Sequence, residues 1–232
     1  MIKLRNMLIA IIAMVGLTTS AQSFEGWGIG GTYSFHEFDT KGTETENRSG
    51  AEEDGSTSAD TQSTSEAKDV EVGSFFLEYT VPQGSTFGIE VVPGDGELGA
   101  RTRTDTQSDS NEATDNSGDY TGKARISDHT MVYAEPTIMA SENFGIYLKG
   151  GIAKVTVETL ESGAMNSTYA NQDVYGTSLG FGAKLYTGQW YWKLDYLETD
   201  YGEVSITSSS GESTITAEPE AESMKLSLGY NF

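Results

Sequence analysis

Histidine is the side chain best suited to acid–base chemistry near neutral pH, and the sequence contains only two, His36 and His129. Each has hydroxyl and carboxylate neighbours, as a nucleophile, base and orienting group would require. No catalytic motif of fixed spacing accompanies them. We therefore predict that both histidines are rim residues of the fold and that the protein is not an enzyme. The neighbours in question are Ser34, Asp39, Ser127 and Asp128.

A second group of residues offers hard oxygen ligands of the kind that coordinate calcium. The segment DTQSDSNEATDNSGD contains Asp105, Asp109, Asp115 and Asp119. It lacks the ligand spacing of an EF-hand, and its composition is typical of a solvated loop. We expect at most weak, collective binding of divalent cations, with no dedicated metal site and no cofactor.

A third group of charges interrupts segments that otherwise alternate between apolar and small residues. Glu78 and Glu90 lie on either side of the short segment PQGS, and Lys184 and Lys193 lie on either side of TGQ. Asp195 shares the parity of Lys193. Whether these opposite charges meet depends on the elements that carry them.

The N-terminal segment MIKLRNMLIAIIAMVGLTTSAQS predicts a signal peptide over residues 1–21. Lys3 and Arg5 precede an apolar core that is too short for a spanning helix, which requires roughly 20 residues. The mature domain would then cover residues 22–232. It has no cysteine and hence no disulfide, and the net charge of -21 excludes the basic surface of a nucleic-acid-binding protein.

Alternation with a period of two recurs in eight segments, which predicts eight strands. In the second segment, Phe75 and Leu77 alternate with Ser74 and Glu78. The fifth segment is less regular, because Lys149 and Lys154 have opposite parity; one of them must lie at an interface, or the strand contains a bulge. The predicted strands are residues 24–38, 69–81, 86–100, 124–138, 144–158, 172–186, 190–204 and 222–232.

The connections between these segments alternate in length. Residues 82–85, 140–143 and 187–189 form short links, whereas the other connections are long, polar and acidic. An antiparallel meander with an even number of strands has this pattern when every long loop emerges at one end. The long loops are predicted at about residues 39–68, 101–123, 159–171 and 205–221.

The two faces of the segments differ in a way that suits a membrane. One parity carries Trp, Tyr, Phe and Leu, which suits lipid, and the other carries Gly, Ser, Thr and isolated charges, which suits a narrow lumen. In hydrocarbon only a closed barrel satisfies every backbone group of a sheet. The predicted fold is therefore an all-β, membrane-spanning, eight-stranded antiparallel up-and-down β-barrel.

The sequence ends on ESMKLSLGYNF, in which Leu228, Tyr230 and Phe232 alternate with smaller or polar residues. This ending resembles the C-terminal signature of outer-membrane β-barrel proteins, which the barrel-assembly machinery reads. Residues 24 to 232 resemble the small eight-stranded family that includes the transmembrane domain of outer membrane protein A and outer membrane protein X. The resemblance implies the outer membrane of a Gram-negative cell, and Phe232 as the last residue implies that no peptidoglycan-binding domain follows.

The favoured function is a structural or surface-interaction role with a plugged lumen. A small porin-like channel is the alternative, and an outer-membrane lipid-modifying enzyme is less favoured. Expected partners are outer-membrane lipid, lipopolysaccharide, the assembly machinery, and extracellular partners or phage, with no nucleic acid. We expect a monomer with both termini in the periplasm.

The charged residues can now be placed in the predicted barrel. Glu78, Glu90, Lys184 and Lys193 would point inward in one layer near the short turns, with Asp195 and Lys225 as further members. An eight-stranded barrel is only wide enough for side chains to fill, so these charges would meet and close the lumen. A water-filled lumen in which each charge is solvated separately remains the alternative.

Overall fold

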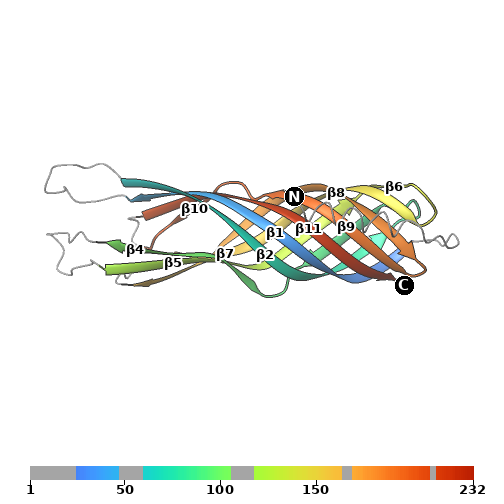
Figure 1. The fold of residues 1–232 in the computed structure, drawn as a ribbon, viewed down its shortest axis with the longest axis horizontal. Helices are drawn as coiled ribbons and strands as arrows, with labels where there is room; N and C mark the ends of the chain where they lie inside the picture. The colour runs from blue at the N-terminus through green and yellow to red at the C-terminus, as the bar shows by residue number, and fades with distance from the viewer. Residues whose placement is uncertain (1–24, 47–59, 106–117, 164–168, 210–212) are drawn as a thin grey trace.

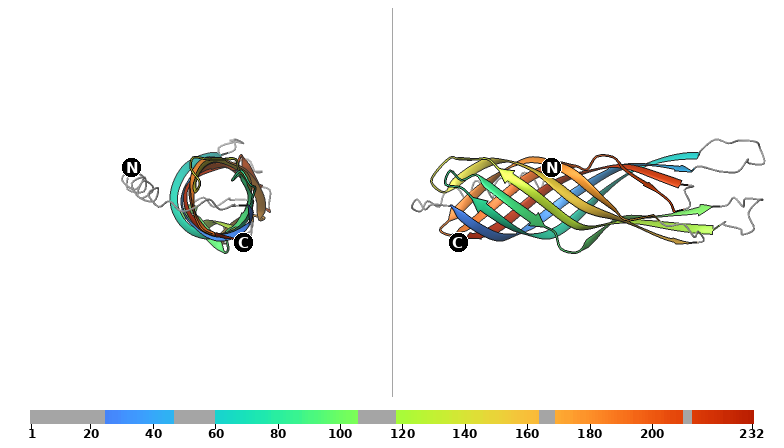
Figure 2. Two further views of the ribbon diagram at one scale, coloured as in Figure 1. Left: turned by 90° about the vertical axis from the view of Figure 1, so that its right-hand side faces the viewer. Right: turned by 180° about the vertical axis from the view of Figure 1, so that it is seen from behind.

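The structure, a computed structural model, describes residues 25–46, 60–105, 118–163, 169–209 and 213–232. They form one antiparallel sheet that closes on itself (Figure 1; Figure 2). No helix in these ranges is long and apolar enough to cross a membrane. The strands are β1 (Gly26–Glu46), β2 (Asp60–Thr80), β3 (Thr86–Val91), β4 (Asp95–Asp105), β5 (Gly118–Glu135), β6 (Thr137–Met139), β7 (Phe144–Gly163), β8 (Gln172–Thr187), β9 (Trp190–Asp200), β10 (Val204–Thr207) and β11 (Ser213–Asn231).

Eight positions around the barrel account for these segments. The ring runs through β1, β2, β3, β5, β7, β8, β9 and β11, and the pairing of β11 with β1 completes it. The other three strands continue the strands that precede them, since β4 pairs with β5, β6 with β7, and β10 with β11. The predicted eight-stranded antiparallel barrel is confirmed.

The two ends of the barrel differ. The turn end carries the short connections between β2 and β3, β6 and β7, and β8 and β9, together with Gly26 and the C-terminus. Gly84 and Gly188 have positive φ angles of 86° and 64°, which glycine adopts without steric cost in a tight turn. Long hairpins extend from the opposite, hairpin end (Figure 1).

The strands at the hairpin end are longer than predicted. β1 and β2 pair residue for residue as far as Glu46 and Asp60, and β4 pairs with β5 as far as Asp105 and Gly118. The predicted loops are therefore wrong in these parts, as they are where β7, β10 and β11 occupy predicted loop positions. The Ser- and Thr-rich segments resemble loops in composition, but pairing with a neighbouring strand satisfies their backbone groups.

The apolar face of the barrel wall points outward. Phe75 and Leu179 are 66% and 68% exposed, whereas Glu78 and Lys184 are 2% and 1% exposed on the inner face. A soluble barrel has the reverse arrangement. The wall therefore presents an apolar surface to lipid, as its alternation predicts.

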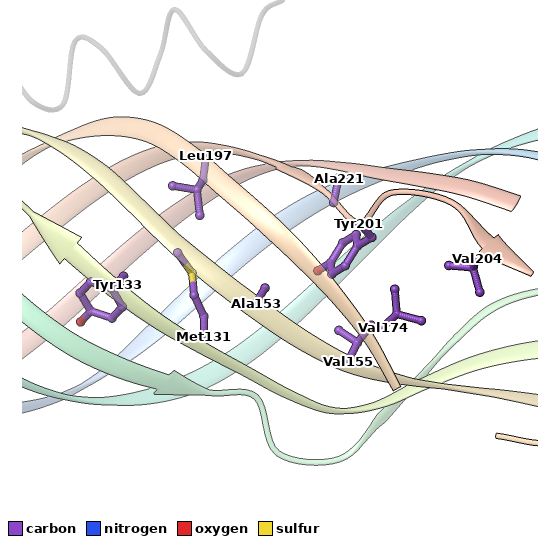
Figure 3. Close-up of a cluster of buried hydrophobic side chains, with 9 residues drawn as sticks. All are labelled: Met131, Tyr133, Ala153, Val155, Val174, Leu197, Tyr201, Val204 and Ala221. Carbon is purple, nitrogen blue, oxygen red and sulfur yellow. The ribbon is translucent and has the colours of Figure 1, made fainter. Parts of the chain in front are cut away.

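Two apolar clusters fill the lumen in addition to its polar residues. Phe76, Tyr186 and Tyr191 form the cluster nearer the turn end. The larger cluster extends toward the hairpin end, where Tyr201 and Val204 lie inside the barrel (Figure 3). Its remaining members are Met131, Tyr133, Ala153, Val155, Val174, Leu197 and Ala221.

Candidate functional site

The candidate site is a network of buried charges inside the barrel, which we call the lumen network. Each of its residues is at most 2% exposed. Four carboxylates and four ammonium groups balance one another. The members are Glu78, Glu90, Glu135, Asp195, Lys149, Lys184, Lys193 and Lys225.

Glu135, near the end of β5, is the centre of the network. Its carboxylate lies 2.9 Å from Nζ of Lys193, 3.2 Å from Nζ of Lys149 and 3.4 Å from Nζ of Lys184. The three lysines come from β9, β7 and β8. One carboxylate therefore links four of the eight barrel positions.

Lys193 connects this centre to the opposite wall of the barrel. Its Nζ lies 2.7 Å from Oε2 of Glu78 on β2. The hydroxyl of Tyr133 also donates a hydrogen bond to Oε2 of Glu78, at 2.7 Å. Glu78 is thus held by one charged and one neutral donor.

A second pairing joins β3 to β11. Nζ of Lys225 lies 3.0 Å from Oε1 of Glu90 and 3.1 Å from Oε2. Oγ of Ser74 donates to Oε1 of Glu90 at 2.6 Å. Both carboxylate oxygens therefore have partners, which is what makes a buried charge tolerable.

Asp195 and the aromatic rings complete the network. Asp195 accepts from Lys149 at 3.2 Å and from the hydroxyl of Tyr147. Nζ of Lys149 also lies 4.2 Å from the centroid of the Tyr133 ring, and Nζ of Lys184 lies 4.9 Å from that of Tyr147. These are cation–π distances, so the rings add to the stabilisation of the ammonium groups.

Inward-facing glycines provide the space for these rings. A Cβ atom at Gly88 would lie 2.5 Å from the hydroxyl of Tyr133, and one at Gly182 would lie 2.5 Å from Cζ of Tyr147. Neither distance is compatible with a side chain. The lumen is therefore packed with large residues opposite glycine, and the apolar clusters adjoin the charges on both sides.

The structure brings all six predicted members into this network, with partners that differ in part from those expected. Glu78 pairs with Lys193, but Lys184 pairs with Glu135, and Glu90 pairs with Lys225. The sequence interpretation missed Glu135. Lys149 was noted only for its parity, and it points inward, whereas Lys154 pairs with Asp173 at 2.7 Å on partly exposed side chains.

The two histidines do not form the acid–base arrangement considered from the sequence. Nε2 of His36 and Nδ1 of His129 are buried and have no hydrogen-bond partner among the described residues. Oγ of Ser34 donates to the carbonyl of Val72 at 3.3 Å, and Oγ of Ser127 donates to Glu158 at 3.2 Å. The two nearby hydroxyls thus contact other groups.

The four aspartates considered as candidate calcium ligands are only partly described. Asp105 ends β4 and Asp119 lies in β5, opposite Thr104. Asp109 and Asp115 lie outside the described residues. Within the described ranges, no group of three or more His, Asp or Glu residues is placed to hold a metal ion.

Above the apolar wall, toward the hairpin end, four exposed carboxylates form a row across adjacent strands, which we call the acidic row. Glu37 on β1 lies opposite both Asp69 on β2 and Glu222 on β11, and Glu222 lies opposite Glu198 on β9. Like charges directly opposite one another destabilise a sheet. The hydroxyl of Tyr196 lies 3.0 Å from Glu198 and 3.1 Å from Glu222, at the edge of the apolar wall.

The terminal residues lie at the turn end. The backbone N–H of Phe232 donates to the carbonyl of Trp27 at 2.9 Å, and the Phe232 side chain is 69% exposed. Tyr230 packs edge-on against Trp190, with ring centroids 5.1 Å apart. Leu228 also faces outward, beside Trp192 of β9.

Replacement of Phe232 by alanine should reduce the amount of inserted barrel in cells while leaving a correctly assembled barrel nearly as stable. Burial of this exposed ring contributes at most about 1.5–3 kcal/mol to the free energy of unfolding. We therefore predict that the main role of Phe232 is in assembly. The measurement is the heat-modifiable, folded fraction in membrane extracts, with Phe87→Ala, another exposed phenylalanine, as the matched control. Unchanged insertion and yield would contradict the assembly role.

A family model described as "Outer membrane protein beta-barrel domain" matches residues 7–232. A search of curated proteins finds no match.

Solved structures that are similar to this chain share little sequence with it. Neisserial surface protein A is 7% identical, with 86% of this chain and 97% of that chain covered and a TM-score of 0.43. The attachment invasion locus protein Ail of Yersinia pestis is 11% identical, with 87% and 99% covered and a TM-score of 0.39. The outer membrane protease OmpT from Escherichia coli is 11% identical, with 93% and 99% covered and a TM-score of 0.34. At these identities and TM-scores, no conclusion about this chain rests on the likeness.

Proposed function

Because the chain belongs to the outer membrane protein beta-barrel domain family, we propose that it has a structural or surface-interaction role in the Gram-negative outer membrane, with a plugged lumen. The lumen network is the observation that carries this proposal. Its charges are paired across the barrel from β2, β3 and β5 to β7, β8, β9 and β11. Side chains therefore occupy the space that a solute would need.

The surroundings of the network support the same role. Tyr186 and Tyr191 lie on its turn side, the Phe76 ring lies beside Lys193, and Tyr201 and Val204 lie toward the hairpin end. Charges between two apolar layers have little access to bulk water, and separating such a pair is costly. A stable plug leaves the outer wall and the long hairpins as the surfaces available to partners.

The proposed topology places the turn end in the periplasm and the hairpins outside the cell. Outer-membrane lipid and lipopolysaccharide would contact the apolar wall, and the hairpins would meet extracellular partners or phage. The barrel-assembly machinery would act on the terminal strand, and the assembled protein would be a monomer. A deletion strain compared with its parent for permeability, adhesion and phage sensitivity tests the role directly.

A non-enzymatic role is part of the proposal. The buried nitrogens of His36 and His129 have no described hydrogen-bond partner, so they are not poised to activate Ser34 or Ser127. Replacement of both histidines by alanine should leave phospholipid and lipid A composition unchanged in cells that produce the protein. A lipid product that disappears with the histidines would instead establish an enzyme.

The plug predicts little or no steady conductance for the native protein in planar bilayers. Lys193→Ala removes the ammonium group that bridges Glu78 and Glu135, so it should raise the conductance. Lys154→Ala is the matched control, since this lysine pairs on partly exposed side chains with Asp173. A large, stable open channel in the unmodified protein would eliminate the plug and favour the porin-like alternative.

A further inference from the structure

A hollow interrupts the apolar wall where β9, β11, β1 and β2 lie side by side (Figure 1). It has a volume of about 650 Å³, which is within the range of pockets that hold small ligands. We call it the wall hollow. Two glycines of the outward-facing parity lie in it between apolar and aromatic side chains. Among the residues that line it are Gly31, Tyr33, Gly73, Phe75, Trp192 and Leu226.

The two glycines of the wall hollow are not required by packing. A Cβ atom at Gly31 would lie 3.6 Å from the carbonyl oxygen of Ser74, and one at Gly73 would lie 4.0 Å from that of Thr32. Both are ordinary contact distances, in contrast to those at the inward-facing glycines of the lumen. Glycine weakens a strand, and where the fold does not need it, it often marks a place where a ligand approaches the backbone. The wall hollow is therefore a candidate ligand site.

Aromatic rings alternate with these glycines across the two strands. Gly31 lies opposite Phe75, and Gly73 lies opposite Tyr33. The hydroxyl of Tyr33 donates a hydrogen bond to Oε2 of Glu71 at 2.6 Å, which holds this ring on the side of the hollow that faces the hairpin end. The hollow is thus an apolar space below an anchored ring, and in a lipid-facing wall the apolar group available to fill it is an acyl chain.

The acidic row lies above the wall hollow at the height of a lipid headgroup. Gly73 is four residues from Asp69 along β2, and Gly31 is six residues from Glu37 along β1. At about 3.3 Å per residue and a strand tilt of about 40°, these separations correspond to roughly 10–15 Å along the membrane normal. The hydrocarbon of one leaflet is about 15 Å thick. A lipid with a chain in the hollow would therefore have its headgroup at the acidic row.

The charge at this height favours one class of headgroup. Glu37, Asp69 and Glu71 are exposed on the outer face. Among the described residues of β1 and β2, the first basic side chain on this face is Lys41, four residues beyond Glu37. Carboxylates repel an anionic headgroup, whereas a primary ammonium group donates charge-assisted hydrogen bonds to them. The carboxylates and the apolar hollow together match a lipid that carries an amine.

We propose that the wall hollow binds one acyl chain of a phospholipid with a primary ammonium headgroup. The chain lies over Gly31 and Gly73, beside the Tyr33 ring, and the ammonium group contacts Glu37 and Glu71. This lipid occupies a defined site, whereas lipids elsewhere on the wall exchange without preference. The inference rests on the proposed position of the wall in lipid and names the lipid class that it selects.

The test uses Trp192, which lines the wall hollow, as a fluorescent reporter in the full chain. Trp27→Phe and Trp190→Phe remove the other two tryptophans, and the protein is placed in phosphatidylcholine nanodiscs. Quenching is compared between phosphatidylethanolamine and phosphatidylglycerol that carry the same brominated chain. We expect phosphatidylethanolamine to reach half-maximal quenching at about a threefold lower mole fraction, as one exposed charge contact would give. Equal quenching by the two lipids, or stronger quenching by phosphatidylglycerol, would overturn the inference.

Native mass spectrometry of the unmodified chain with the same two lipids provides a comparison that needs no substitution. One molecule of phosphatidylethanolamine should be retained in preference to phosphatidylglycerol. Equal retention by a protein that does not conduct would refute this inference alone, whereas a conducting native protein would refute the plugged-lumen function.

A filling variant locates the acyl chain. Gly31→Leu places a side chain in the wall hollow, so the preference for phosphatidylethanolamine should be lost. The matched control is Gly150→Leu, which adds the same side chain to the wall at a glycine of β7 whose Cβ atom would have no neighbour within 4 Å. Equal effects of the two leucines would contradict the assignment to the wall hollow.

A charge variant locates the headgroup. Glu37→Gln with Glu71→Gln should bring the two lipids to equal quenching, because the ammonium group loses its charged partners. The matched control is Glu142→Gln with Glu203→Gln, which changes the net charge equally at two exposed residues away from the hollow. A preference that survives the first pair of substitutions would contradict the ammonium contact.

Discussion

Replacement of Glu135 by alanine should lower the free energy of unfolding by about 3–5 kcal/mol, the range measured when one partner of a buried charge pair is removed. Glu135 faces three lysine ammonium groups, from Lys149, Lys184 and Lys193. Its removal leaves three buried positive charges with fewer partners. Urea unfolding of the refolded protein in detergent, followed by tryptophan fluorescence, measures the change.

Glu142→Ala is the control, because Glu142 is an exposed residue of the turn between β6 and β7. Its unfolding midpoint should match that of the native protein. Combining Glu135→Leu with Lys184→Met should recover part of the loss, since one unpaired charge is removed together with the carboxylate. A Glu135→Ala variant as stable as the native protein would show that water solvates these lysines separately, which is the alternative left open by the sequence.

Replacement of Gly229 by valine should destabilise the barrel by about 1–3 kcal/mol, as expected when a side chain is forced into a filled space. A Cβ atom at Gly229 would lie 2.6 Å from Cε2 of Tyr191. The ring has little room to move, because its centroid lies 5.6 Å from that of Tyr186 and 6.3 Å from that of Phe76. The same urea titration measures this effect.

A double variant shows whether the collision is the cause. Tyr191→Ala removes the ring that the new side chain would meet, so Gly229→Val should cost much less in the Tyr191→Ala background than in the native protein. Gly150→Val serves as the control, because a Cβ atom there would have no neighbour within 4 Å. Equal costs of Gly229→Val in both backgrounds would locate the effect in the strand backbone instead.

The sequence was sufficient to predict the barrel because lipid and lumen impose opposite requirements on alternate residues. Leu77 and Glu78 are neighbours in β2, yet the first is 41% exposed on the wall and the second is buried in the lumen. Such a contrast, repeated with short and long connections in turn, specifies the number of strands and their faces. The same parity placed Lys184, Lys193 and Asp195 inside the barrel.

The centre of the lumen network was harder to predict because β5 is irregular. Its register with β7 shifts between Ser127 and Thr130, and Asp128 has a positive φ of 52°. This bulge changes which parity faces inward, so a single alternation does not describe the whole strand. Met131, Tyr133 and Glu135 then share the inner face, which the pattern shows only when the lower part of β5 is read alone.

The partners of the charged side chains and of the hairpin strands also cannot be predicted from one sequence alone. Three lysines, Lys184, Lys193 and Lys225, were candidates for Glu90, and its pairing with Lys225 follows from the heights of β3 and β11, which depend on the barrel's stagger. The extended hairpins were missed for a related reason. A Ser- and Thr-rich segment such as residues 60–68 can be loop or strand, and the partner strand decides between them.

The acidic row implies that resistance to unfolding is graded along the barrel axis. Nearer the turn end, opposite charges inside the lumen hold the strands together, whereas at the level of Glu37 and Glu222 like charges on neighbouring strands repel one another. The strand segments at the hairpin end should therefore open locally more often. Their amide exchange should be faster, and it should slow when salt screens the repulsion. The barrel would unfold first at the hairpin end. Mechanical or thermal stress would then open the hairpins while the plugged part of the lumen stays folded and closed to solutes.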